Sequence, residues 1–210
     1  MHPKGPIAFM VRHGRTVLND PQNPRLRAWE NPPLCRLGQL DAAMAAQKLK
    51  RFQPQMIYSS DLTRDLQTAE ILAQELGNLP NEVAYELRTA DMGHWSGELE
   101  EDVGQQVGRW YREPWIHPPG EGESNNEFLR RFLPWFDDKL ELARDVEGFR
   151  PSIFVAHGRN LAAVHARANK IPQIEGMMSF PGGIMMISID DRGEPKVDYL
   201  GETEPVQQDV

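Results

Sequence analysis

The chain has 210 residues, a formal net charge of -8, 40% hydrophobic and 26% charged residues, and one cysteine. This length allows one domain with a sizeable core, and we expect a single domain over residues 1–210. The acidic charge, without a basic stripe, disfavours nucleic acid and anionic membranes as partners. A lone cysteine excludes an internal disulfide and a cysteine metal cluster, and no run of eighteen apolar residues occurs, so we expect a soluble, cytoplasmic protein.

Two continuous apolar runs are predicted strands that end in the same way. Ile7–Val11 leads into His13, and Ser152–Ala156 leads into His157 before a helical stretch over residues 160–168. Apolar runs of this length are typical of buried strands. Open α/β sheets bind ligands at the carboxyl ends of their strands. We therefore expect the two histidines to meet at that edge.

The segments between these strands alternate between helical and extended patterns. A helix is predicted from Arg36 towards Lys50, with Leu37, Leu40 and Met44 on one face, and another over residues 62–76, with Gly77 as its stop signal. A third helix spans residues 128–140, where Pro134 should kink or divide it. Strands are expected at residues 56–58, 184–189 and 197–200. This order predicts a three-layer α/β/α sandwich with a mostly parallel central sheet.

Two segments rich in proline are predicted to be long loops. They cover residues 19–33 and 111–126, and both should leave the sheet near the two histidines. Loops of this length in a compact domain are usually functional or disordered. The acidic tail after residue 201 is expected to be frayed.

Arg12, His13, Arg64 and His157 make chemical sense together as a cage for a phosphoryl group. Guanidinium groups bind phosphoryl oxygens bidentately, and an imidazole is a competent covalent nucleophile. Ser60 or Asp61 is a good helix N-cap, which would place Arg64 in the first helical turn beside free amides that favour an anion. No metal site or cofactor is predicted, because neither histidine has a ligand at metal-binding spacing and no phosphate loop or dinucleotide fingerprint occurs.

Six segments in order resemble the histidine phosphatase superfamily, the phosphoglycerate-mutase-like proteins. They are Val11-Arg12-His13-Gly14-Arg15-Thr16 with Asn19, Leu34–Gln39, Tyr58–Arg64 with Gln67-Thr68-Ala69, Gly93-His94-Trp95-Ser96-Gly97, Gly122-Glu123-Ser124 and Ala156-His157-Gly158. The resemblance implies a phosphoglycerate-mutase-like fold, phosphorylation of His13, and binding of the phosphoryl group by Arg12, Arg64 and His157. It also implies that Asn19 assists, and we add Gly14, Thr16, Gly158 and Arg15 to the predicted substrate-binding residues.

One position departs from the family pattern. Family members usually carry a glutamate four residues before Gly93 as proton donor to the leaving oxygen, and this chain has Thr89 there. A threonine hydroxyl is not acidic enough for that task. Asp91 is our predicted substitute, with Glu86 and Glu98 as weaker alternatives. Arg15 and Arg27 could contact a second anionic group of the substrate, but the sequence favours a solvated loop charge for each.

The leading hypothesis is a metal-independent phosphatase that hydrolyses a phosphomonoester through a phosphohistidine on His13. The substrate would be a small phosphorylated molecule or a phosphoprotein. One alternative is a phosphoglycerate-type mutase, which would return the phosphoryl group to a substrate instead of water. The other is a binding module with little turnover, which the replacement by Thr89 would explain.

Overall fold

The computed structural model describes residues 5–19, 22–144, 150–171, 180–190, 192 and 194–200. The tail after residue 201, predicted to be frayed, lies outside these residues. Six strands form one sheet in the order β3-β2-β4-β1-β5-β6. Their bounds are β1 Pro6–Arg12, β2 Met56–Ser59, β3 Asn81–Val83, β4 Ser152–Ala156, β5 Ile184–Ile189 and β6 Pro195–Tyr199.

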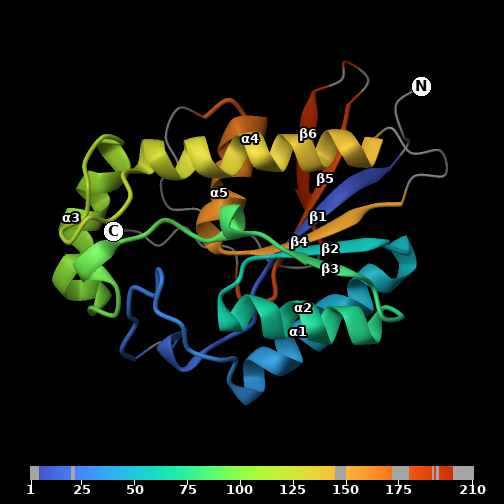
Figure 1. Ribbon diagram of the computed structural model, residues 1–210, viewed down its shortest axis with the longest axis horizontal. Coiled ribbons are helices and arrows are strands. Elements are labelled where there is room, and N and C mark those ends of the chain that lie inside the picture. Colours follow the sequence, from blue (N-terminus) through green and yellow to red (C-terminus); the bar gives the residue numbers. More distant parts are fainter. Residues whose placement is uncertain are drawn as a thin grey trace.

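Helices cover both faces of this sheet, as Figure 1 shows, which confirms the three-layer prediction. The lower layer holds α1 (Arg36–Leu49) and α2 (Thr63–Glu75), and the upper layer holds α4 (Asn125–Arg144) and α5 (Gly158–Ala168). Helix α3 (Glu100–Arg112) lies to one side of the layers. Short 3-10 turns occur at Val17–Asn19, Lys50–Phe52, Tyr85–Leu87 and Gly93–Trp95.

The central strands are buried on both faces because their sequences are apolar throughout. In β1, Phe9 and Val11 face a core cluster with α1 and α2, while Ala8 and Met10 face the larger cluster beneath α4 and α5. Strands β1 and β4 are parallel neighbours, with Val11 opposite Val155. Their carboxyl ends are therefore level, and both point to the side where α3 lies (Figure 1).

The sheet is mostly parallel, as predicted, with one exception. Strand β1 pairs in parallel with β4, β4 with β2, and β2 with β3. Strand β5 is antiparallel to both of its neighbours, β1 and β6. Strand β3 and helix α3 were absent from the sequence prediction. The second predicted loop, residues 111–126, is shorter than expected, because α3 extends to Arg112 and α4 begins at Asn125.

Two helix predictions need correction. Leu37, Leu40 and Met44 of α1 are 52%, 53% and 57% exposed, so the predicted apolar face points to solvent. The inward face carries alanines and Leu49, because small side chains let the helix approach the sheet closely. Pro134 does not divide α4, which runs without a break from Asn125 to Arg144.

Candidate active site

His13 is the residue after β1, and its ring is held in one orientation. Its backbone amide donates to Ala156 O at 3.0 Å, and its Nδ1 lies 2.8 Å from Gly14 O. Since a carbonyl oxygen only accepts, Nδ1 carries the proton and Nε2 keeps a lone pair. Burial, together with Arg64 and Arg12, lowers the pKa of His13 well below its ordinary value. The imidazole is therefore neutral and nucleophilic near neutral pH.

His157 follows β4 and faces His13, so the two histidines meet as predicted. Their ring centroids are 5.2 Å apart with planes at 63°. Nε2 of His157 lies 3.3 Å from Ser60 Oγ, and Nδ1 lies 3.4 Å from an Arg64 guanidinium nitrogen. Burial and the neighbouring cations Arg64 and Arg12, with His13, lower the pKa of His157 well below its ordinary value.

Arg64 lies in the first turn of α2, as predicted, and its side chain is completely buried. Its guanidinium donates to Glu30 O at 2.5 Å and to Ala28 O at 2.8 Å. Both acceptors belong to the long loop after β1. Arg64 therefore joins α2 to that loop and still directs a nitrogen towards His157.

Arg12 completes the cage from the end of β1. It is 5% exposed, and its guanidinium carbon is 3.8 Å from the place where a side chain at Gly158 would begin. Burial, with the charges of Arg27 and Arg64, lowers the pKa of Arg12 to about 9, so it stays protonated at neutral pH. The four predicted residues thus form one buried, cationic cluster that suits an anionic ligand.

Arg27 acts on the same four residues. Its charge lowers the pKa values of Arg12, His13, Arg64 and His157. Its guanidinium lies 3.4 Å from Leu18 O, in the segment that follows His13. The sequence favoured a solvated loop charge for this residue, but the structure places Arg27 beside the cage.

The start of α2 differs from the sequence prediction. The helix begins at Thr63 with Leu62 in the N-cap position, and neither Ser60 nor Asp61 occupies it. Asn31 Oδ1 instead accepts from the Thr63 amide at 2.7 Å, so this amide is not free for an anion. Asp61 is paired with Arg88.

The residues after His13 form a tight turn that is held internally. Gly14 N donates to Thr68 Oγ1 at 3.1 Å, and the Thr16 amide and hydroxyl both donate to Asn19 Oδ1, at 2.9 and 3.1 Å. A Cβ atom at Gly14 would lie 2.1 Å from Gly38 O, so only glycine fits at this position. These contacts stabilise the His13 loop, and substrate binding by Gly14, Thr16, Asn19 and Gly158 stays a prediction.

Arg15 makes a bidentate ion pair with Asp41 of α1, at 2.8 and 2.7 Å. This pair raises the pKa of Arg15. No described contact joins its side chain to the cage, so a role in substrate binding finds no support in the geometry.

The position of the missing glutamate is occupied by structural contacts. Thr89 O accepts from Trp29 Nε1 at 2.9 Å and from Arg131 at 3.1 Å. Asp91 Oδ1 accepts from the Gly93 amide at 2.9 Å, a turn-forming contact. A different carboxyl group, Glu100 at the start of α3, raises the pKa values of Arg12 and Arg27. Its amide donates to Pro24 O at 2.9 Å, which places α3 against the loop that carries Arg27.

Sequence reasoning missed Asp65 and Glu100. Asp65 follows Arg64 directly and is completely buried, with Oδ2 3.4 Å from His157 Nε2. Helical spacing could have indicated an inward position, since Ala69 lies four residues on, but a carboxylate is rarely assigned to a buried face. Glu100 gave no local signal, because only the packing of α3 brings it to the site.

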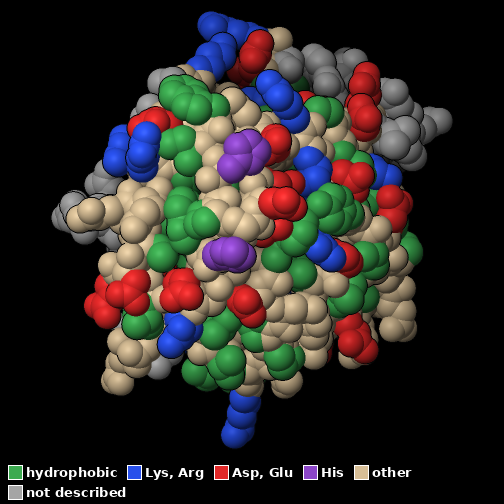
Figure 2. All heavy atoms as spheres, turned by 60° about the vertical axis from the view of Figure 1, so that its left-hand side comes forward, with side chains coloured by type: hydrophobic (Ala, Val, Ile, Leu, Met, Phe, Trp, Pro, Cys, Tyr) green, Lys and Arg blue, Asp and Glu red, His purple; other side chains and the backbone are tan. Residues whose placement is uncertain are grey.

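The surface around this edge gives little sign of the cage. Figure 2 shows the face that includes α3, where acidic side chains lie near histidine side chains and few basic side chains gather. Arg12 and Arg64 are buried, so the attraction for anions is local. Among the described residues, no group of three or more His, Cys, Asp or Glu side chains could hold a metal ion.

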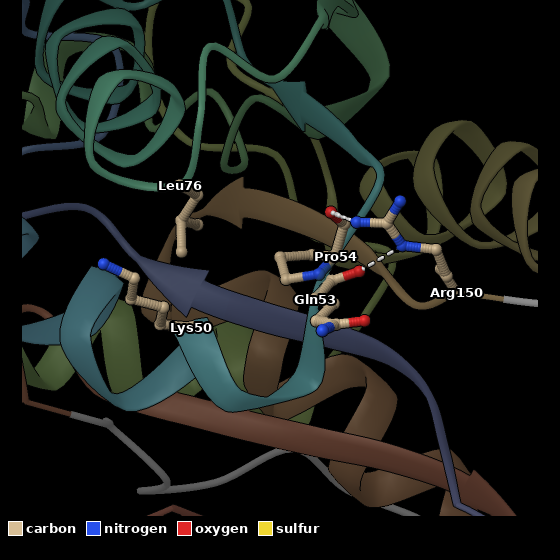
Figure 3. Close-up of a pocket in the computed structure, with 5 residues that line it drawn as sticks. All are labelled: Lys50, Gln53, Pro54, Leu76 and Arg150. Carbon is tan, nitrogen blue, oxygen red and sulfur yellow. Dashed lines mark hydrogen bonds between the residues drawn. The ribbon is translucent and has the colours of Figure 1, made fainter.

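A separate pocket lies at the opposite edge of the sheet. Lys50, Gln53, Pro54, Leu76 and Arg150 line it, and Figure 3 shows Arg150 directed at two backbone carbonyls. Arg150 donates to Gln53 O at 2.7 Å and to Pro54 O at 3.3 Å. Pro54 and Arg150 precede β2 and β4, so this pocket is far from the strand ends that carry the histidines.

A family model for the histidine phosphatase superfamily (branch 1) matches residues 8–200. The chain belongs to this superfamily. The resemblance seen in the sequence is confirmed, and the chain is a histidine phosphatase-type enzyme. For members of this superfamily, a phosphohistidine mechanism is typical. In the part of the chain that the structure describes, no helix is long and apolar enough to cross a membrane.

Its relatives include phosphatases and mutases. The chain is 33% identical over 169 residues to a glucosyl-3-phosphoglycerate phosphatase of Mycolicibacterium vanbaalenii, covering 78% of this chain and 74% of the relative. It is 30% identical over 198 residues to a 2,3-bisphosphoglycerate-dependent phosphoglycerate mutase of Parvibaculum lavamentivorans, covering 89% and 92%. A mycobacterial glucosyl-3-phosphoglycerate phosphatase structure with VO3 matches with a TM-score of 0.78 and 28% identity, over 91% of this chain and 96% of that one.

Proposed function

We propose that this histidine phosphatase hydrolyses a phosphomonoester with His13 Nε2 as the nucleophile. The observation that carries the proposal is the fixed ring of His13, neutral and protonated on Nδ1, inside a cage of buried cations. In the first step the Nε2 lone pair forms a bond to phosphorus, and the phosphorus–oxygen bond of the ester breaks. In the second step water attacks phosphorus and the phosphorus–nitrogen bond breaks, which returns His13 and releases inorganic phosphate.

Arg12, Arg64 and His157 would stabilise the charge that develops on the equatorial oxygens. The groups are already in place and buried, so little reorganisation is needed when the transition state forms. Arg12 packs against Gly158, and Arg64 is anchored at the loop carbonyls. The leaving oxygen needs a proton, and we propose Asp91 or Glu100 as its source, with the charge coupling to Arg12 favouring Glu100.

The substrate class follows from the third guanidinium. Two arginines suffice for one phosphoryl group, and Arg27 adds a cation at its edge. A second anionic group on the substrate, such as a carboxylate, would complement it. By name, the relatives act on phosphoglycerate compounds, which carry a carboxylate beside the phosphoryl group. We propose small phosphorylated hydroxy acids as substrates, in a cytoplasmic location that the single cysteine supports.

The experiment measures phosphate release from a panel of phosphomonoesters in the presence of EDTA. We expect release by the wild type, faster for esters with a neighbouring carboxylate, and none by His13→Ala. His165→Ala is the matched control. His165 lies in the last turn of α5, away from His157, and its side chain is hydrogen-bonded to the Tyr199 hydroxyl of β6. Equal rates for wild type and His13→Ala would refute the nucleophile.

A mutase is the alternative outcome of the same experiment. Adding 2,3-bisphosphoglycerate and a monophosphoglycerate would then give phosphoryl exchange faster than phosphate release. A phosphohistidine that accumulates on His13 without either product would favour the binding module.

A further inference from the structure

Asp65 occupies an unusual position at the base of the cage. Its side chain is completely buried, with Oδ2 3.4 Å from His157 Nε2 and 3.8 Å from Arg64 Nε. Neither of its carboxylate oxygens has a well-aligned hydrogen bond within the described residues. A buried carboxylate with so little compensation is costly. Its location next to an imidazole suggests how the cost is offset when ligand binds.

The surroundings of the pair disfavour charge on both members. Burial raises the pKa of Asp65 to about 7, against the effects of Arg64 and Ser60. Burial also lowers the pKa of His157, and the charges around it act in the same direction. The charged or titratable groups around the pair come from the end of β1, the long loop and the start of α2: Arg12, His13, Arg27, Asp61 and Arg64. Most of these groups are cationic and disfavour a positive charge on His157. A bound dianion would offset their charge and favour the protonated imidazole.

Geometry assigns the two nitrogens of His157 to opposite partners. Nε2 faces Asp65 and the Ser60 hydroxyl, whereas Nδ1 lies on the side of Arg64. A phosphoryl oxygen held by Arg64 would meet Nδ1, which must then carry a proton in order to donate. A buried aspartate on the far side of an imidazole is known to fix its tautomer and stabilise its protonated form.

We propose that Asp65 is a positioning residue that makes His157 a doubly protonated imidazolium when a phosphoryl group fills the cage. Nε2–H then faces the Asp65 carboxylate and Nδ1–H faces a phosphoryl oxygen. The imidazole takes up one proton from solvent as the anion binds, and no covalent bond changes between heavy atoms. The inference rests on the proposed function, because it assigns a task to one residue of the same site.

The test uses tungstate, a tetrahedral dianion, with protein labelled with ¹⁵N at histidine. His157 is assigned by the resonance that His157→Gln removes, and its nitrogen shifts report which nitrogens carry protons. In the wild type with tungstate, at about pH 7.5, we expect both nitrogens to be protonated, well above the ordinary imidazole pKa. In Asp65→Asn, which keeps the shape and removes the charge, we expect one protonated nitrogen.

Glu70→Gln is the matched control, because it removes a carboxylate on the exposed face of the same helix, where Glu70 accepts a hydrogen bond from Gln74. Its His157 signals should match those of the wild type. In the pH profile of kcat, which reports the substrate complex, Asp65→Asn should move the alkaline limb at least about one unit to lower pH. A neutral His157 in the tungstate-bound wild type overturns the proposal even if the variant does not fold. Tighter tungstate binding by Asp65→Asn with unchanged His157 signals also overturns it, since Asp65 would then be only a counterion to Arg64.

These outcomes are separable from the fate of the proposed function. Tungstate binding and protonation of His157 need no turnover. A protein that binds tungstate with an imidazolium but hydrolyses no ester would refute the phosphatase and leave the role of Asp65 standing. Hydrolysis through His13 with a neutral His157 would support the phosphatase and refute the role of Asp65.

Discussion

Replacing Arg64 by lysine keeps the positive charge of the cage but removes the planar guanidinium group, which can donate to two acceptors from two nitrogens. The arginine donates to Glu30 O with Nη1 and to Ala28 O with Nη2, and Nη2 also lies 3.4 Å from His157 Nδ1. A lysine ammonium has three donors on one atom and cannot span these positions. We expect Arg64→Lys to abolish bidentate phosphoryl binding and to leave one or both loop carbonyls without a donor.

The expected effect follows from the hydrogen bonds that a lysine cannot make. Removing one preorganised donor to transition-state charge costs about 100-fold to 1,000-fold in rate, or about 2.7–4 kcal/mol. Each buried carbonyl left without a donor costs about 1–3 kcal/mol of stability, and each kcal/mol corresponds to about 2–4 °C in Tm for a chain of this size. Arg64→Lys should therefore lower kcat/KM by at least about 100-fold and Tm by several degrees.

The assay combines steady-state hydrolysis of a phosphomonoester with thermal unfolding. Arg150→Lys is the matched control, because Arg150 also donates to two backbone carbonyls but at the opposite edge of the sheet (Figure 3). It should lose some stability and keep its activity. Activity of Arg64→Lys within about threefold of the wild type would refute the reasoning, since charge alone would then suffice.

Three further predictions concern the acid, the nucleophile and the loop. Glu100→Gln should lower the rate of hydrolysis of alkyl phosphates about 100-fold and spare p-nitrophenyl phosphate, whose leaving group needs no proton. Asp91→Asn should change both rates by less than about tenfold. The opposite pattern would assign the acid to Asp91. As pH falls below about 6.5, the free energy of unfolding of the wild type should fall relative to that of His13→Gln by up to about 1.4 kcal/mol per pH unit. The reason is that His13 binds a proton in the unfolded chain but stays neutral when it is buried in the folded chain. A constant difference in the free energy of unfolding between the two proteins across pH would contradict this. Gly14→Ala would place a Cβ 2.1 Å from a backbone oxygen of α1 and should lower both Tm and activity, whereas Gly104→Ala in α3, with open space around it, should do neither.

The sequence was most informative where short segments carry both structure and chemistry. The apolar runs ending at His13 and His157 predicted two adjacent strand ends, and the structure places the rings 5.2 Å apart. Burial on both faces of the sheet follows from such runs, because a strand that is apolar throughout has no side suited to solvent. The position of Arg64 could be predicted equally well, since it lies in the first turn of a helix that follows directly after a strand.

Other features depend on long-range packing that no local pattern reports. The exposed stripe of Leu37, Leu40 and Met44 was assigned to the interior because helical periodicity does not distinguish a face lined by alanines from one lined by larger side chains. Glu100 acts on Arg12 and Arg27 because its segment packs against the long loop, where its amide donates to Pro24 O. Asp65 contradicts the usual rule on buried carboxylates, and such exceptions concentrate at functional sites.

The loop contacts of Arg64 have a consequence for how this scaffold can diversify. The arginine recognises the loop through the carbonyl oxygens of Ala28 and Glu30, one of which belongs to a residue with a φ of 36°. Backbone atoms are common to all amino acids, so the side chains of this loop can change without disturbing the anchor, provided that the chain keeps its path. Substrate preference should in this way be adjustable without loss of the phosphoryl chemistry, and libraries randomised at the loop side chains other than Arg27 and Asn31 should retain hydrolysis while altering which ester is preferred.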